Sequence, residues 1–252
     1  MKKGPFNKIH PAVIAVWASI VALGHILPTI PILGTGGTFS LSSALAPLSG
    51  IFFGPAAGAL CSAVGGFIGS LIAPHTAWMG LGTFIIGTTT AFTSGCIAWG
   101  RGAPVSVNAN GGFVINGAII IYIIGTLLWF TQETGRGIFY FPLIYYGLGF
   151  IALVTGSIFS ERMFTSKKKV FLFTAVWISA FGGMIGGASI GNFFSLVLYR
   201  QPVEIWAVLT IVAPIERVIF AAGAMLIGVP LLSGMNKMGI PAGPWQDEDN
   251  ED

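Results

Sequence analysis

Long apolar runs dominate this sequence. Six or more of them reach the ~20 residues that an α-helix needs to cross ~30 Å of hydrocarbon. Only 8% of the 252 residues are charged, whereas a soluble domain carries roughly a quarter, and 54% are hydrophobic. A single globular core cannot hide so much apolar surface, so most of it must face lipid. The sequence therefore predicts an all-α, multi-pass helix bundle in the cell membrane.

The breaks between these runs predict eight membrane helices in one domain covering residues 1–240. Residues 41–73 would make a helix of about 50 Å, which is too long for one span, and Gly54-Pro55 divides it because proline removes a helix donor. The expected helices cover residues 12–33, 41–53, 56–73, 79–99, 112–130, 139–159, 170–199 and 204–232. Residues 241–252 hold five of the nine acidic side chains, and we expect them to form a disordered cytoplasmic tail.

The Lys and Arg residues indicate how the chain is oriented. With the N-terminus inside and eight spans, only Arg136 and Arg200 fall outside, and Arg217 lies within a span. The nine remaining basic residues all fall on the inner side: Lys2, Lys3, Lys8, Arg101, Arg162, Lys167, Lys168, Lys169 and Lys237. Cytoplasmic loops of membrane proteins carry this excess, so both termini are expected in the cytoplasm. Because the basic residues sit singly or in short runs at loop edges, they do not indicate a nucleic-acid partner.

The residue inventory argues against catalysis. The sequence has no P-loop motif, and no Asp precedes Asp247. Before the tail the only acidic residues are Glu133, Glu161, Glu204 and Glu216. The three histidines, which are not spaced for one helix face, are His10, His25 and His75. We therefore expect neither an enzyme, nor a metal site, nor a cofactor, but a protein that carries a small molecule and is surrounded by lipid.

Glu216 and Arg217 stand in the middle of the last expected helix. Glu216 lies about 18 Å beyond Glu204 along the helix axis, which places it near the bilayer midplane. A charge there costs roughly 2.5–3.5 kcal/mol, so such residues face a cavity or a partner and mark ligand or ion pathways. Either the pair binds substrate, or each charge is paired with polar groups of neighbouring helices as internal support. Asn192 on the preceding helix is a further candidate for substrate binding.

Two external segments supply the remaining binding candidates. The loop of residues 34–40 is uncharged and glycine-rich, and Thr38 within it would face a ligand if the loop is a lid rather than an ordinary surface turn. Trp78 lies in the next external turn, either as a ligand contact or as an interfacial anchor.

Glycines recur at every fourth residue in the seventh expected helix. Gly183, Gly187 and Gly191 would let another helix backbone approach closely, which favours either tight static packing or a smooth surface along which helices slide.

The break at Gly54-Pro55-Ala56-Ala57-Gly58 resembles that of the substrate-binding S components of energy-coupling-factor (ECF) vitamin transporters, in which a short apolar helix precedes such a turn. Residues 228–237 are similar to the final span of that family. Ala15, Ala18 and Ala22 are similar to the alanine motif by which such components dock on a coupling protein. The family usually has six spans, so 112–130 and 139–159 would be two additional helices.

This resemblance implies the substrate-specificity subunit of an ECF-type importer. Its ligand would be a vitamin or similar small nutrient, bound near the outer face. A transmembrane coupling protein and two ATPase subunits would be its partners, which would explain why this chain has no P-loop. The alternative is a self-sufficient, ion-coupled secondary transporter in which Glu216 carries a proton or pairs with a cation.

Overall fold

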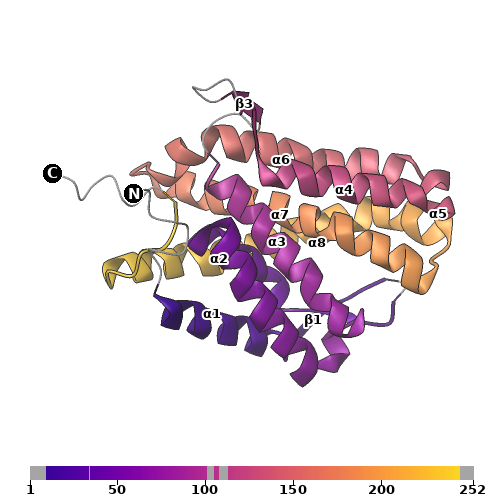
Figure 1. The fold of residues 1–252 in the computed structure, drawn as a ribbon, viewed down its shortest axis with the longest axis horizontal. Coiled ribbons are helices and arrows are strands. Elements are labelled where there is room, and N and C mark those ends of the chain that lie inside the picture. The colour runs from indigo at the N-terminus through magenta and orange to yellow at the C-terminus, as the bar shows by residue number, and fades with distance from the viewer. Residues whose placement is uncertain (1–9, 34, 101–104, 108–112, 245–252) are drawn as a thin grey trace.

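The computed structural model describes residues 10–33, 35–100, 105–107 and 113–244. They form a bundle of α-helices with two short antiparallel hairpins, which confirms the predicted all-α membrane fold (Figure 1). The helices are α1 (Pro11–Gly24), α2 (Ser42–Ile72), α3 (Thr83–Ala98), α4 (Gly117–Thr131), α5 (Glu133–Gly137), α6 (Tyr140–Phe164), α7 (Lys169–Tyr199) and α8 (Val203–Lys237). The 3₁₀ turns η1 (Pro74–Thr76) and η2 (Gly80–Gly82) precede α3.

The helices differ in their capacity to span a membrane. Four of them, α2, α6, α7 and α8, are long and apolar enough to do so, as is the continuous segment Gly80–Ala98 that includes α3. The helices α1 and α4 are also apolar but shorter, at 14 and 15 residues.

The chain reverses direction within α2, at Gly54. This glycine has φ 81° and ψ 172°, a conformation that side chains disfavour, and Pro55 follows it. A Cβ on Gly58 would lie 2.5 Å from the Cα of Gly50, although eight residues of straight helix would separate them by about 12 Å. The break predicted at Gly54-Pro55 is therefore present, and it turns α2 into two antiparallel segments.

The first expected helix is too long by about nine residues. We expected it to reach residue 33, but α1 ends at Gly24, and β1 (Pro28–Pro31) then pairs with β2 (Thr38–Ser40). The cause is the pair of prolines. Each lacks an N–H and disfavours a helical conformation in the residue before it, so the helix stops before Pro28. The predicted external loop is therefore part of a β-hairpin.

Glycines of α7 pack directly on α3, near the centre of the bundle. A Cβ on Gly183 would lie 2.8 Å from the backbone N of Ser94, and one on Gly187 would lie 2.9 Å from the carbonyl of Ile86. A larger side chain on this stripe would force the two helices apart. In this structure the stripe is a tight packing surface.

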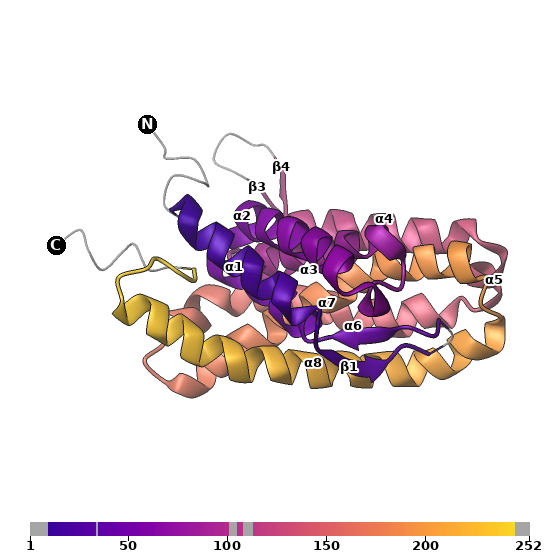
Figure 2. The ribbon, with the colours of Figure 1, turned by 90° about the horizontal axis from the view of Figure 1, so that it is seen from below.

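The two helices that we expected to be additional, α4 and α6, lie at the side of the bundle (Figure 1). Figures 1 and 2 show α4 and α6 running together on the side opposite α1 and the β1–β2 hairpin. They pack against α7, and α6 also contacts α8. A second hairpin, β3 (Val105–Val107) with β4 (Phe113–Ile115), leads into α4.

The basic residues divide between the two ends of the bundle as predicted. The α6–α7 turn and the end of α8 lie at one end of the bundle, while α5 and the α7–α8 turn lie at the other (Figures 1 and 2). The first end carries Arg162, Lys169 and Lys237, and the second carries Arg136 and Arg200. The assignment of the first end to the cytoplasm stays a prediction.

The chain after α8 folds back on the bundle. Ala242 is buried, and the N–H of Gly243 donates to the carbonyl of Phe52 at 2.8 Å. Packing thus continues a few residues past the expected domain boundary at residue 240. Residues 245–252, the larger part of the predicted acidic tail, lie outside the described residues.

Candidate functional site

A cavity lies between the β1–β2 hairpin and helices α2, α3, α7 and α8. Its volume, counted as the space that the centre of a water molecule can occupy, is about 130 Å³. On that measure a single water needs about 10–15 Å³, so the cavity has room for a small organic molecule. Hydroxyl-bearing side chains line much of it: Thr38, Ser40, Ser42, Ser43, Ser62, Thr76, Thr83, Thr90 and Ser195.

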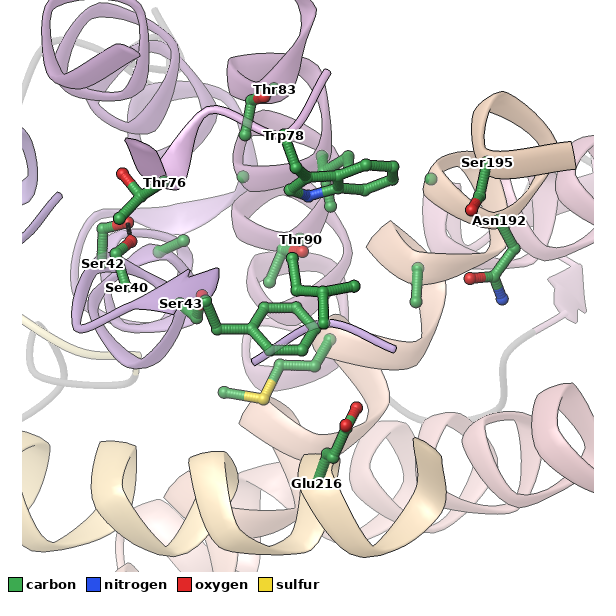
Figure 3. A pocket seen from close by; sticks show the side chains of 18 of the residues that line it. Ser40, Ser42, Ser43, Thr76, Trp78, Thr83, Thr90, Asn192, Ser195 and Glu216 are labelled. Carbon is green, nitrogen blue, oxygen red and sulfur yellow. Dashed lines mark hydrogen bonds between the residues drawn. The ribbon is translucent and has the colours of Figure 1, made fainter. Parts of the chain in front are cut away.

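All five residues predicted to bind substrate line this cavity. They come from four parts of the chain: Thr38 from the hairpin, Trp78 from the turn before α3, Asn192 from α7, and Glu216 and Arg217 from α8. Figure 3 shows the carboxylate of Glu216 pointing from α8 into the cavity, with Asn192 and Ser195 to one side and the Ser40–Ser42 hydroxyl pair on the other. The fold thus collects residues that are up to 179 positions apart in the sequence.

Arg217 uses its guanidinium group to support the site. Its Nε donates to the hydroxyl of Tyr145 at 3.0 Å, and its Cζ lies 4.7 Å from the centre of the Phe39 ring. Phe39 also packs edge-to-face on Phe220 of α8, with 5.3 Å between the ring centres. Arg217 and Phe220 together fasten the hairpin to α8.

Polar contacts also hold the hairpin and the Trp78 turn to the α7–α8 corner. Gln201 is buried there, and its Nε2 donates to the carbonyl of Leu33 at 3.2 Å. Its Oε1 accepts from the hydroxyl of Ser195 at 2.9 Å. The Tyr199 hydroxyl donates to the carbonyl of Trp78. These contacts close the cavity at the end of the bundle that carries the α7–α8 turn.

Several buried polar atoms in the cavity wall have no hydrogen-bond partner in the described part of the protein. They are Nδ1 of His25, Oγ1 of Thr38, Oγ of Ser62 and Nε1 of Trp206. Among the described residues only one other buried side-chain atom, Oδ1 of Asn236, shares this property. A buried polar atom without a partner costs about 1–3 kcal/mol, so such atoms are rare except where a ligand or water satisfies them. Four of the five gather around one cavity.

The sequence of this chain matches the model of a known protein family. The sequence model of the family described as "ECF-type riboflavin transporter, S component" matches residues 7–145, more than half of the chain. This chain belongs to that family. The predicted resemblance to ECF S components is thereby confirmed, and the chain is a multi-pass protein of the cell membrane.

The match covers only part of the S component's cavity. It includes α1 to α5 and the first residues of α6, and with them His25, Thr38, Ser62 and Trp78. It does not include α7 and α8, which supply Asn192, Glu216 and Arg217. No curated protein and no solved structure matches the chain.

The alanines expected to dock a partner differ in exposure. Ala18 and Ala22 of this S component are each 4% exposed because they face α2, where a Cβ on Gly65 would lie 2.4 Å from the carbonyl of Ala18. The face that we expected to be free is thus occupied by the protein's own helix. Ala15 is exposed, and the hydroxyl of Ser19, one turn further, donates to its carbonyl. If α1 docks on a coupling protein, the Ala15–Ser19 side is the surface available.

Sequence reasoning predicted only five residues of the cavity wall, and those that it missed include the polar side chains of His25, Ser62, Gln201 and Trp206. His25 was considered only as a candidate metal ligand, and Ser62 is one of several serines in an apolar run. Nothing in their spacing distinguishes them, because the wall is assembled from separate helices. Pro28, close after His25, was the one available signal, since it ends α1 and places His25 at the helix terminus. In the described residues, no three His, Cys, Asp or Glu side chains come together as metal ligands do.

Proposed function

We propose that this chain is the substrate-specificity subunit of an ECF-type importer, and that it binds riboflavin or a closely related vitamin in the cavity described above. The observation that carries this proposal is the gathering of four unpartnered buried polar atoms in the wall of one cavity. A ligand with donors and acceptors along its length would form hydrogen bonds with these atoms. Those bonds would offset the free-energy cost of burying the atoms without a partner.

The chemistry of the wall suits a flavin. Riboflavin has a flat aromatic ring system with amide-like groups and a chain of hydroxyls, and it carries no net charge. The cavity offers aromatic faces for the ring, neutral hydroxyls for the chain, and one carboxylate that can accept from an N–H of the ring. The aromatic side chains are Phe39, Trp78, Phe84, Phe141 and Trp206.

The position of the cavity supports uptake from outside. It is closed by the hairpin and the Trp78 turn, at the end of the bundle with fewer basic residues. By the positive-inside rule this end faces outward. We propose that the vitamin enters there, and that the chain binds and carries it without catalysing a reaction.

Partner subunits are proposed to supply the energy. The chain has no P-loop, and ECF S components work with a transmembrane coupling protein and two ATPases. The test is uptake of labelled riboflavin into proteoliposomes, with the chain alone or in complex with those subunits. We expect uptake only with the complete complex and ATP, and none when the P-loop lysines of the ATPases are replaced. Uptake by the chain alone under an ion gradient would instead support a secondary transporter using Glu216.

A further inference from the structure

Two of the unpartnered residues, His25 and Ser62, belong to other helices than the charged residues Glu216 and Arg217 of α8. His25 ends α1 and Ser62 belongs to α2, and they are 6% and 1% exposed. Neither Nδ1 of His25 nor Oγ of Ser62 has a partner in the described protein.

Glycines of α2 bring these two side chains together. Ser62, Gly66 and Gly69 follow each other at steps of four and three, so they lie on one face of the helix. The His25 ring lies on this stripe, because a Cβ on Gly69 would be 2.3 Å from its Cδ2 and one on Gly66 would be 3.9 Å from its Nε2. Ser62 is one turn, about 6 Å, further along the same stripe.

The α3 helix packs against the same part of the cavity wall, beside Ser62. A Cβ on Gly87 of α3 would lie 3.2 Å from Oγ of Ser62. Other hydroxyls nearby are already used: Thr76 donates to the carbonyls of His25 and Ala73, and Ser42 bonds to Ser40. Nδ1 of His25 and Oγ of Ser62 are therefore the polar atoms in this part of the wall that have no partner at all among the described residues.

We propose that His25 and Ser62 form a polar subsite for the hydroxylated chain of the ligand, in the part of the cavity wall formed by α1 and α2. The inference rests on the function proposed above. Both groups can donate and accept: the serine hydroxyl does both, and a neutral imidazole has one donor and one acceptor nitrogen. An alcohol has the same dual character. No charged side chain on α1, α2, α3 or the hairpin lines the cavity in the described residues, which fits a neutral chain.

The test measures the affinity of two flavins for two variants of the protein. Riboflavin carries the hydroxylated chain, and lumiflavin has a methyl group in its place. Ser62→Ala should weaken riboflavin binding about tenfold, the loss of one hydrogen bond, and leave lumiflavin binding within about twofold. Ser70→Ala is the matched control. It lies on the same helix, outside the cavity wall, and its hydroxyl already donates to the carbonyl of Gly66 at 2.8 Å. Its affinities for both flavins should equal those of the wild type.

Thermal unfolding without ligand gives an independent readout. Ser62→Ala removes a buried hydroxyl that has no partner, so the melting temperature should be equal to or higher than that of the wild type. Gly87→Ala serves as a second variant, because it keeps every polar group and narrows the space beside the hydroxyl of Ser62. It should also weaken riboflavin more than lumiflavin.

The outcomes separate the subsite from the proposed function. If Ser62→Ala weakens both flavins equally or neither of them, the subsite is wrong while vitamin binding stands. A lower melting temperature with unchanged affinities would show that Ser62 supports the fold only. If the wild type binds neither flavin, the proposed riboflavin function falls, and the subsite falls with it.

Discussion

Glu216 and Arg217 are adjacent in the sequence but have different surroundings in the fold. Glu216 is 7% exposed and points into the cavity, whereas the guanidinium of Arg217 is engaged by Tyr145 and Phe39. Sequence reasoning left two interpretations open for the pair, substrate binding and internal support. The geometry favours binding for Glu216 and support for Arg217.

The first prediction concerns Glu216→Gln, which keeps the shape of the side chain and removes its charge. We expect riboflavin affinity to fall by about tenfold or more, because an ionised carboxylate makes the stronger hydrogen bond, worth about 1.5–3 kcal/mol. The melting temperature of the ligand-free protein should not fall. Glu204→Gln, an exposed position on the same helix, is the control and should change neither quantity. Unchanged affinity with lowered stability would identify Glu216 as internal support.

The residues that could be foreseen were those whose type is unusual for their place in the sequence. A charge in the middle of an apolar run and an uncharged glycine-rich loop can be recognised from the linear sequence alone. Glu216, Arg217 and Thr38 were selected in this way. His25 and Ser62 become exceptional only when α1, α2 and α3 are packed and their polar atoms are left without partners. That property belongs to the tertiary structure, and no local pattern carries it.

At the scale of elements, the backbone properties of Gly and Pro explain why the break within α2 was predicted correctly and why the end of α1 was not. Gly54-Pro55 was read as a break because it combines a flexible residue with one that lacks a donor, and the chain reverses there. The first helix was expected to run to residue 33, although α1 stops at Gly24. Hydropathy alone continues smoothly through residues 25–33, so it could not show that they enter a hairpin.

The second prediction concerns the contact between α7 and α3. Gly187→Ala would place a Cβ 2.9 Å from the carbonyl of Ile86, so the helices must separate. We expect a loss of about 1–3 kcal/mol in stability, as for other overpacked sites, seen as a lower melting temperature. Gly147→Ala on α6 meets no atom within 4 Å and should be nearly neutral. If the two variants unfold at the same temperature, the stripe does not pack as described.

The third prediction concerns the exposed side of α1. Ala15→Trp should abolish co-purification with a coupling protein, because a large side chain prevents close approach of two helices in lipid. Riboflavin binding by the isolated chain should be unchanged, since Ala15 does not line the cavity. The control is Thr174→Trp, which adds the same indole to an exposed position on α7. Assembly that survives Ala15→Trp would mean that another surface docks.

At the scale of the whole molecule, α4 and α6, the two helices expected to be additional to a six-helix core, contribute little to the cavity wall. The α4 helix contributes no wall residue, and α6 contributes Phe141. The family model matches all of α4 and the start of α6, so the expectation that these two helices are additional to a six-helix core stays a prediction. The membrane class could be predicted from the sequence because it follows from hydropathy, whereas the number of spans stays a prediction. The arrangement of the segments around the cavity depends on the contacts between them.

The most direct test of the account is a riboflavin titration of the purified chain, followed by quenching of flavin fluorescence. Ser43 lines the cavity, and Ser43→Trp fills the space with an indole (Figure 3). The account predicts saturable binding of one riboflavin per chain by the wild type and by Thr174→Trp, and loss of binding in Ser43→Trp with its melting temperature retained. Equal binding by all three proteins would contradict it, because the vitamin would then bind outside this cavity.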